Sequence, residues 1–196
     1  GYAALGANTT GINNIAMGSY AADANTTGHY NVALGVLSLT ANTTADGNTS
    51  VGYGTMSANT TGANNTALGR EALAANTTGT NSVAVGYQAL DAQTTGGINV
   101  AVGNGSMTSQ TTGEFNVAVG RNTLATSTTG AGNTAVGDAA LYATVGNNNT
   151  GVGYAALYAN TTGTQNVAVG REALEANTTA SDNTAVGFKS LEAHTT

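Results

Sequence analysis

The chain has 196 residues, of which only 7% are charged and 28 are glycine, and it contains no proline, cysteine or tryptophan. Its four basic residues and net charge of −6 argue against a nucleic-acid partner, because phosphate contacts require clustered lysine and arginine. The absence of cysteine excludes a disulfide framework and a thiolate metal site. No apolar run approaches the roughly 20 residues that span a bilayer, so we expect no membrane insertion within this segment.

A seventeen-residue unit repeats along the whole chain, with the consensus G-x-x-A-L-x-A-N-T-T-G-x-x-N-V-A-V numbered from position 1 to position 17. A fixed period over twelve units predicts a solenoid in which each coil packs on its neighbours. We therefore expect residues 1–196 to form one array of twelve coils, the ninth of 16 residues and the last incomplete. Neither end resembles a cap, so the pattern is expected to continue beyond at least one end or to meet other molecules there. The position-1 glycines are Gly1, Gly18, Gly35, Gly52, Gly69, Gly86, Gly103, Gly120, Gly137, Gly153, Gly170 and Gly187.

One coil contains two short alternating segments and a turn. In residues 79–95, Val83-Ala84-Val85 is β-branched and alternating, which predicts a strand. Ala89-Leu90-Asp91-Ala92 is a second alternating segment, and the Thr-Thr-Gly that follows is typical of a turn. The six residues 70–75 favour helix by composition but are too few for a stable one. The sequence therefore predicts an all-β fold, a parallel β-solenoid or β-roll with one coil per repeat.

The short ninth unit tests this alignment. Residues 143–146, Ala-Thr-Val-Gly, stand where other units have Ala-Asn-Thr-Thr-Gly, whereas Thr150–Val152 keeps the strand triplet in phase. Loops absorb deletions, and a one-residue slip in a strand would turn its core face outward. We therefore expect the missing residue to come from the loop.

The charges predict which side chains face outward. They occupy positions 2, 3, 6, 12 and 13 and avoid the V-A-V triplet and the leucine position, so we expect the valines and leucines to point inward. The position-16 alanines would then face away from the core, where a column of tiny residues suggests a close contact with another chain. The leucine column at position 5, in which Ala22 is an exception, contains Leu5, Leu39, Met56, Leu73, Leu90, Met107, Leu124, Leu141, Leu157, Leu174 and Leu191. The predicted inter-chain contacts are Ala16, Ala33, Ala67, Ala84, Ala101, Ala118, Ala135, Ala168 and Ala185.

The segment Gly163-Thr164-Gln165-Asn166-Val167-Ala168-Val169-Gly170-Arg171-Glu172-Ala173-Leu174-Glu175-Ala176 resembles the head repeat of YadA-type trimeric autotransporter adhesins. Related N-T-A-V-G-x-x-A-L-x-A-N-T-T-G repeats occur in phage tail fibres and bacterial surface proteins. The resemblance covers the whole chain and implies a parallel β-roll packed side by side as a homotrimer. The seventeen-residue repeat of this chain differs from the adhesin repeat in having an additional Asn-Thr-Thr loop. The resemblance implies no catalytic residues.

Several polar columns could carry chemistry. The Asn-Thr-Thr triplets match the N-glycosylation pattern, but we interpret them as turns whose side chains bond the local backbone. Adjacent threonines point to opposite faces, which argues against a flat ice-binding array at the Thr-Thr columns. The position-14 asparagines are expected to form a stacked amide ladder. His29 and His194 lie about ten coils apart, and the carboxylates are irregular, so we expect no metal site, cofactor or catalytic residue. The asparagines of that ladder are Asn14, Asn31, Asn48, Asn65, Asn99, Asn116, Asn133, Asn149, Asn166 and Asn183.

An aromatic column at position 2 is the remaining candidate site, because exposed aromatic rings can contact a glycan or a receptor. The pattern as a whole favours a non-enzymatic section of an extracellular fibre, either an adhesin head or stalk on a cell surface or a phage tail-fibre shaft on a virion. A self-assembling surface filament and an ice- or glycan-binding solenoid are the alternatives. The aromatic residues in question are Tyr2, Tyr53, Tyr87, Tyr154 and Phe188.

Overall fold

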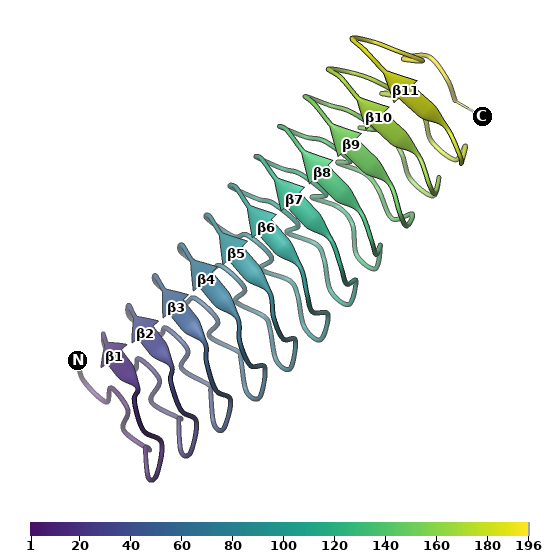
Figure 1. The fold of residues 1–196 in the computed structure, drawn as a ribbon. Coiled ribbons are helices and arrows are strands. Elements are labelled where there is room, and N and C mark those ends of the chain that lie inside the picture. The colour runs from purple at the N-terminus through teal and green to yellow at the C-terminus, as the bar shows by residue number, and fades with distance from the viewer. Residues whose placement is uncertain (196) are drawn as a thin grey trace.

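The computed structural model describes residues 1–195, and over that range the chain winds into a regular rod of stacked coils (Figure 1). Eleven three-residue strands form one parallel sheet in strict sequence order. The strands are β1 (Ile15–Met17), β2 (Val32–Leu34), β3 (Thr49–Val51), β4 (Thr66–Leu68), β5 (Val83–Val85), β6 (Val100–Val102), β7 (Val117–Val119), β8 (Thr134–Val136), β9 (Thr150–Val152), β10 (Val167–Val169) and β11 (Thr184–Val186). No helix occurs in residues 1–195, so the predictions of a parallel β-solenoid and of no helix at 70–75 are confirmed.

Register follows the repeat residue by residue. Val83, Ala84 and Val85 pair with Val100, Ala101 and Val102, and every other pair of neighbouring strands matches in the same way. Thr150 of the short unit pairs with Thr134 and Val152 with Val136, so the strand stays in phase. Val145 and Gly146 both donate their backbone N–H to Thr161 O, in the place where three residues of the loops at 9–11 and 60–62 donate to one carbonyl of the next coil. The prediction that the missing residue comes from the loop is confirmed.

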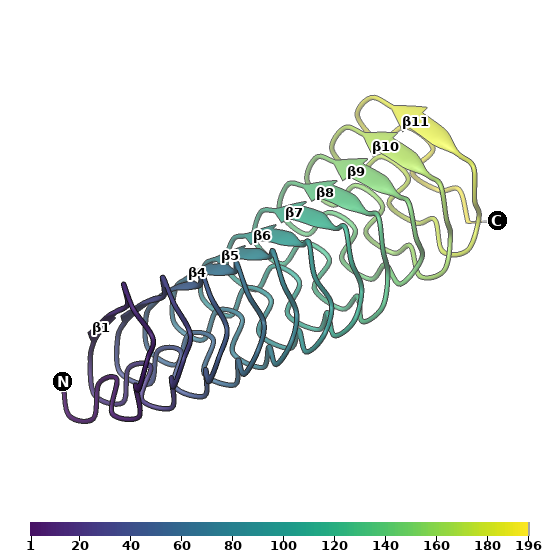
Figure 2. The same ribbon diagram turned by 60° about the horizontal axis from the view of Figure 1, so that its bottom comes forward.

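The rest of each coil consists of turns, and the predicted second alternating segment is not a strand (Figure 2). Glu71 and Leu73 have φ values of 59° and 54°, and positions 3 and 5 show positive φ in every coil. Ala72 N–H donates to Gly69 O, and Asn76 N–H donates to Leu73 O, which closes two successive turns. Inter-coil backbone bonds nevertheless continue through this region. The alternation of Ala89–Ala92 therefore reflects alternating turn conformations, and not a pleated strand.

The inward and outward faces of the strands are opposite to those predicted from hydrophobicity. The middle residue of each strand from β2 to β11 is buried, whereas the first and third residues are half-buried or exposed. At Gly151, which stands in the alanine column, an added Cβ would lie 3.1 Å from Leu141 Cγ and 3.2 Å from Ala156 O. The backbone that limits this column to tiny side chains is therefore the chain's own.

This burial corrects the predicted inter-chain contact. The alanines of β2 to β11 have 0–1% exposure and pack with the buried leucine column, so they cannot reach a second chain. Ala16, in the first coil, is half-buried. The predicted inward position of the leucine column is confirmed from Leu39 to Leu174, while Leu191 is exposed in the last coil. The alanines that this burial corrects are Ala33, Ala67, Ala84, Ala101, Ala118, Ala135, Ala168 and Ala185, and the half-buried Ala16 packs against the same core.

A pair of neighbouring substitutions tests the orientation of the strands. Ala84→Lys should lower the free energy of unfolding by roughly 4 kcal/mol or more, because it places a charge where no space or counter-ion exists. Val85→Lys should retain the folded circular-dichroism spectrum, because its side chain points outward. Urea titrations of the two variants measure the difference. Equal tolerance at both positions would contradict the buried alanine column.

Candidate functional surfaces

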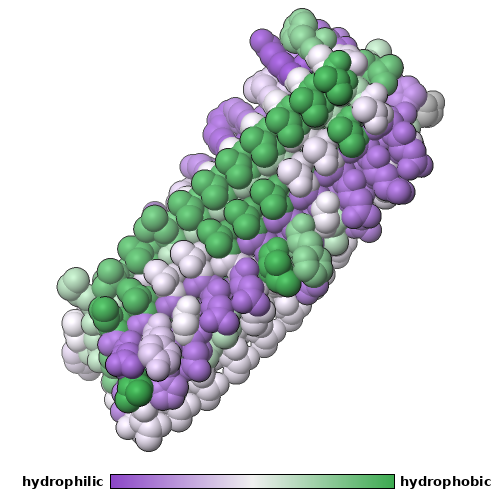
Figure 3. Space-filling view, viewed as in Figure 1, coloured by the Kyte–Doolittle hydropathy of each residue, from purple (hydrophilic) through white to green (hydrophobic). Residues whose placement is uncertain are grey.

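The most extensive apolar surface is the outer sheet face, formed by the first and third residues of β1 to β11. The third residue of each strand is aliphatic, and the first residue of each strand is valine, isoleucine or threonine. Figure 3 shows this face as a hydrophobic band along the whole rod. No charged side chain belongs to it. The column of third residues is therefore aliphatic in all eleven strands, whereas threonine stands at five of the eleven first positions. Contiguous exposed apolar surface of this kind is typical of interaction sites.

Two asparagine columns fill the polar part of the interior. At position 14, Asn65 Nδ2 donates to Gly79 O at 2.8 Å, while its Oδ1 accepts the backbone N–H of Ser82 at 3.0 Å. Both atoms thus satisfy buried backbone groups of neighbouring coils, as protein interiors require. In the first coils each asparagine accepts the backbone N–H of the next one, and Ser82 interrupts the column. Direct side-chain amide bonds confirm the predicted ladder in the C-terminal half, at Asn99–Asn116, Asn133–Asn149, Asn149–Asn166 and Asn166–Asn183.

The asparagines of the Asn-Thr-Thr loops form a second ladder at position 8. Asn76 Nδ2 donates to Asn59 Oδ1 at 2.7 Å and to Gly79 O at 3.0 Å, so the predicted side-chain bond to the local backbone is confirmed. Asn25, Asn42, Asn59, Asn76, Asn160 and Asn177 are fully buried, which closes these acceptor sites to glycosylation in the folded chain. The first threonine of the loop donates its hydroxyl to the next coil's backbone, as Thr60 Oγ1 does to Thr77 O at 3.0 Å. These hydroxyls are therefore already engaged within the solenoid.

The aromatic column at position 2 is exposed, but arginines cover several of its rings. Arg70 Cζ lies 5.8 Å from the ring centroids of both Tyr53 and Tyr87. Arg171 Cζ stands in the same way 5.4 Å from Tyr154 and 6.0 Å from Phe188. Because the guanidinium groups occupy ring faces, the column forms cation–π stacks along the axis. Tyr2 instead makes an edge contact with Tyr20, at 5.4 Å between ring centroids.

A carboxylate cluster near the C-terminal end was not found by sequence analysis. Oxygen atoms of Glu172, Glu175 and Glu192 lie within 4.8 Å of one another. Lys189 Nζ already bridges two of them, at 3.2 Å from Glu172 and 2.6 Å from Glu192. These three residues occupy positions 3 and 6 of one coil and position 6 of the next, so the adjacency of positions 3 and 6 could have revealed the cluster. Among residues 1–195, these are the groups that could hold a cation, and the lysine neutralises much of their charge.

Ion pairs set the pKa shifts on this surface. Burial raises the pKa of Glu172, but hydrogen bonds from Arg171 and Lys189 outweigh that effect and lower it overall. The pKa of Lys189 is raised, chiefly by its hydrogen bond to Glu192. Because the pKa of Glu172 is lower in the folded chain than in the unfolded chain, its carboxylate stabilises the fold at pH values above the unfolded-state pKa. This stabilisation is lost as the pH falls through the folded-state pKa. Burial raises the pKa of Asp91, whose Oδ1 is a buried atom without a hydrogen-bond partner.

The part of the chain that the structure describes contains no pocket. It also lacks a helix long and apolar enough to cross a membrane. His29 accepts the backbone N–H of Ile12 through Nδ1 at 3.0 Å, and His194 lies in the last coil. No family model, curated protein or solved structure matches the chain. The function of the chain is therefore inferred from its surfaces.

Adjacent asparagines test the buried ladder. Asn65→Asp removes the donor to Gly79 O and buries a carboxylate, which should cost roughly 3 kcal/mol at neutral pH. Because burial raises the pKa of the new carboxyl, the deficit relative to the unmodified chain should shrink as pH falls toward its unfolded-state value. Asn64→Asp is the matched control, since Asn64 is exposed and Asp182 stands at the same position. Unfolding titrations at several pH values measure both variants, and equal small losses would contradict the ladder's role.

Proposed function

We propose that this chain is a non-catalytic structural segment of an extracellular fibre, an adhesin head or stalk or a tail-fibre shaft. The stacked coils provide a stiff rod, and the outer sheet face joins three copies side by side. The observation that carries this proposal is the continuous aliphatic column of third strand residues along β1 to β11, on a face that has no charged side chain. Repetition of the same residues in every coil also supplies many equal contacts and few unlike groups for catalysis.

The size of the band supports a stable association. Specific interfaces bury about 800 Å² per partner, and the outer sheet face runs along all eleven strands of the sheet. Depletion of charge at its centre is also typical of protein–protein interfaces. Because the chain carries a net charge of −6, an uncharged face is the surface through which two copies approach with least repulsion. A partner with the same coil spacing can contact this band along its entire length.

The choice of a trimer depends on the resemblance to adhesin head repeats, and an open filament is the alternative within the same fold. A glycan or receptor contact at the aromatic column remains a secondary proposal. The ring faces covered by Arg70 and Arg171 would have to be released before a sugar could stack on them. Localisation at a cell surface or on a virion belongs to the same proposal.

Lysines on the outer sheet face should dissociate the assembly. Val85→Lys, Val102→Lys and Val119→Lys together place three charges at successive coils of the band, where burial against another chain is costly. Mass measured by light scattering should fall from about three chains to one, while the circular-dichroism spectrum stays folded. Thr61→Lys, Thr78→Lys and Thr95→Lys, in an exposed column outside this face, are the control and should leave the mass unchanged.

A monomeric unmodified chain would contradict the proposal. A mass that grows with concentration would favour the filament instead of the trimer.

A further inference from the structure

Three bulky side chains, Tyr30 and the adjacent pair Ile98 and Phe115, stand at position 13, where the other coils up to the eleventh have a polar residue or glycine. This position has positive φ in every coil from the first to the eleventh, and asparagine or glycine occupies it most often. Ile98 and Phe115 occupy it in successive coils with φ values of 57° and 60°. A left-handed backbone is unfavourable for bulky side chains, and most of all for a β-branched one such as isoleucine. Positions 3 and 5 are left-handed in every coil, so Ile98 and Phe115 add to the backbone strain that the regular turns already carry.

Packing within the chain does not compensate for this strain. Ile98 is 48% exposed and Phe115 is 58% exposed. Asparagine at the same position, as in Asn64 and Asn81, would adopt the same backbone at lower cost. Strained residues that persist without an internal benefit point to a function outside the fold.

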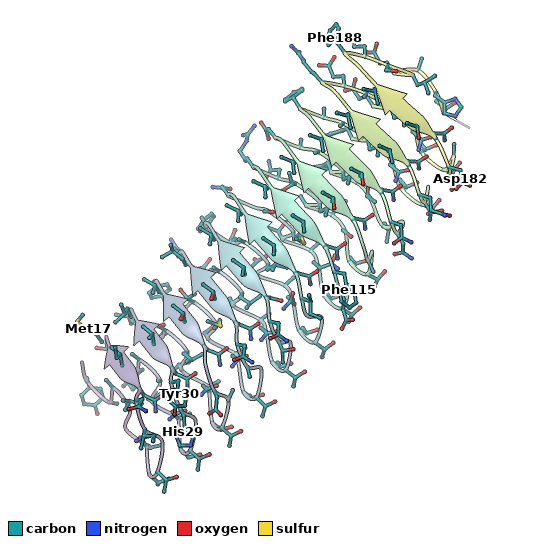
Figure 4. The ribbon with its side chains drawn as sticks, in the orientation of Figure 1. Met17, His29, Tyr30, Phe115, Asp182 and Phe188 are labelled. Carbon is teal, nitrogen blue, oxygen red and sulfur yellow. The ribbon has the colours of Figure 1, made fainter. Side chains whose placement is uncertain are left out.

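The pair extends the outer sheet face at one height of the rod. Asn99 and Asn116, each next along the chain, are buried, so positions 13 and 15 lie on the same outward side of the chain. Figure 4 shows Phe115 beside the beginning of β7. In the column of first strand residues, valine rather than threonine occupies three successive strands here, as Val83, Val100 and Val117. The apolar surface is thus broadest at β6 and β7.

A regular band leaves the axial alignment of two copies poorly defined. The third residues are all valine from β5 to β11, so neighbouring coils offer almost the same contact in this column, and only the first column varies, between valine and threonine. A shift by one coil loses only about one of eleven levels of contact, and periodic strand pairing without distinctive side chains is prone to slippage. Some non-repeating feature must fix the alignment if the assembly has one register.

We propose that Ile98 and Phe115 fix the axial register between neighbouring copies of this chain. In an assembly around an axis parallel to the rod, equal heights coincide, and the pair of one copy packs on the outer sheet face of the next. A slipped assembly leaves these two side chains exposed at one or more interfaces. This inference rests on the proposed self-association and adds the residues that select one alignment.

The test replaces both residues with the asparagine found at the same position of other coils. Ile98→Asn with Phe115→Asn should keep the fold and the assembly mass, because the main band is untouched. A single cysteine, Thr162→Cys, carries a nitroxide label; the chain has no other cysteine, and residue 162 is exposed. Pulsed electron paramagnetic resonance then measures the distances between labels on different chains.

The unmodified register should give one narrow distance, and the double variant should add longer distances from slipped copies. The off-register population is expected to rise roughly tenfold or more, given the apolar area that slippage exposes. Val145→Thr, an exposed valine in the loop column, is the control and should behave as the unmodified chain.

Two results would overturn the register role while leaving self-association intact. One is a single narrow distance in the double variant at unchanged mass. The other is dissociation of the folded double variant, which would make the pair the main source of binding energy. A monomeric unmodified chain would overturn the proposed self-association together with this inference.

Discussion

The whole structure depends on the stacking of identical positions at hydrogen-bonding distance along one axis. Backbone bonds between coils occur in the strands, in the turns and in the Asn-Thr-Thr loops, so each residue meets its own counterpart one coil away. At position 1, Gly86 has a φ of 137°, and a Cβ there would lie 2.4 Å from Gly103 O. Glycine is required at this position by the close approach of the next coil as well as by its conformation.

The same stacking determines the interior. Each coil encloses little space, so its core accepts one leucine, several alanines and two columns of asparagine. Buried amides are stable here because each coil supplies the carbonyl and N–H groups that the preceding coil's amides need. Valine has no place in so narrow a section, and the hydrophobic side chains that remain are displayed outside. Fold stability and surface display therefore have a common origin.

Sequence periodicity was sufficient for the architecture but not for the orientation of the strands. The repeat predicted parallel strands, their register, the leucine column and the loop deletion, all of which depend on position alone. Alternation in Val83–Val85 separates two faces without saying which is inside, and hydrophobicity selected the wrong one. Side-chain volume decides the matter: Ser50 and Gly151 replace alanine in the buried column, so that column is limited by size.

Unusual turns and departures from the consensus were harder to predict from the sequence. The left-handed turns at Glu71 and Leu73 are occupied by residues that rarely adopt positive φ, so no turn signature marked them. The Glu172 cluster and the Ile98–Phe115 pair arise from departures from the consensus, and their meaning depends on which positions lie side by side. Aperiodic positions are therefore where this chain can carry specific recognition.

Hydrogen exchange of asparagine side-chain amides tests the stacking most directly. If identical positions bond along the axis, the Nδ2 protons of Asn48, Asn65 and Asn76 should be protected as strongly as the strand amides. Those of Asn81 and Asn148, which are exposed, should exchange rapidly. Uniformly fast exchange of all five side chains, measured by nuclear magnetic resonance in the folded chain, would contradict the account.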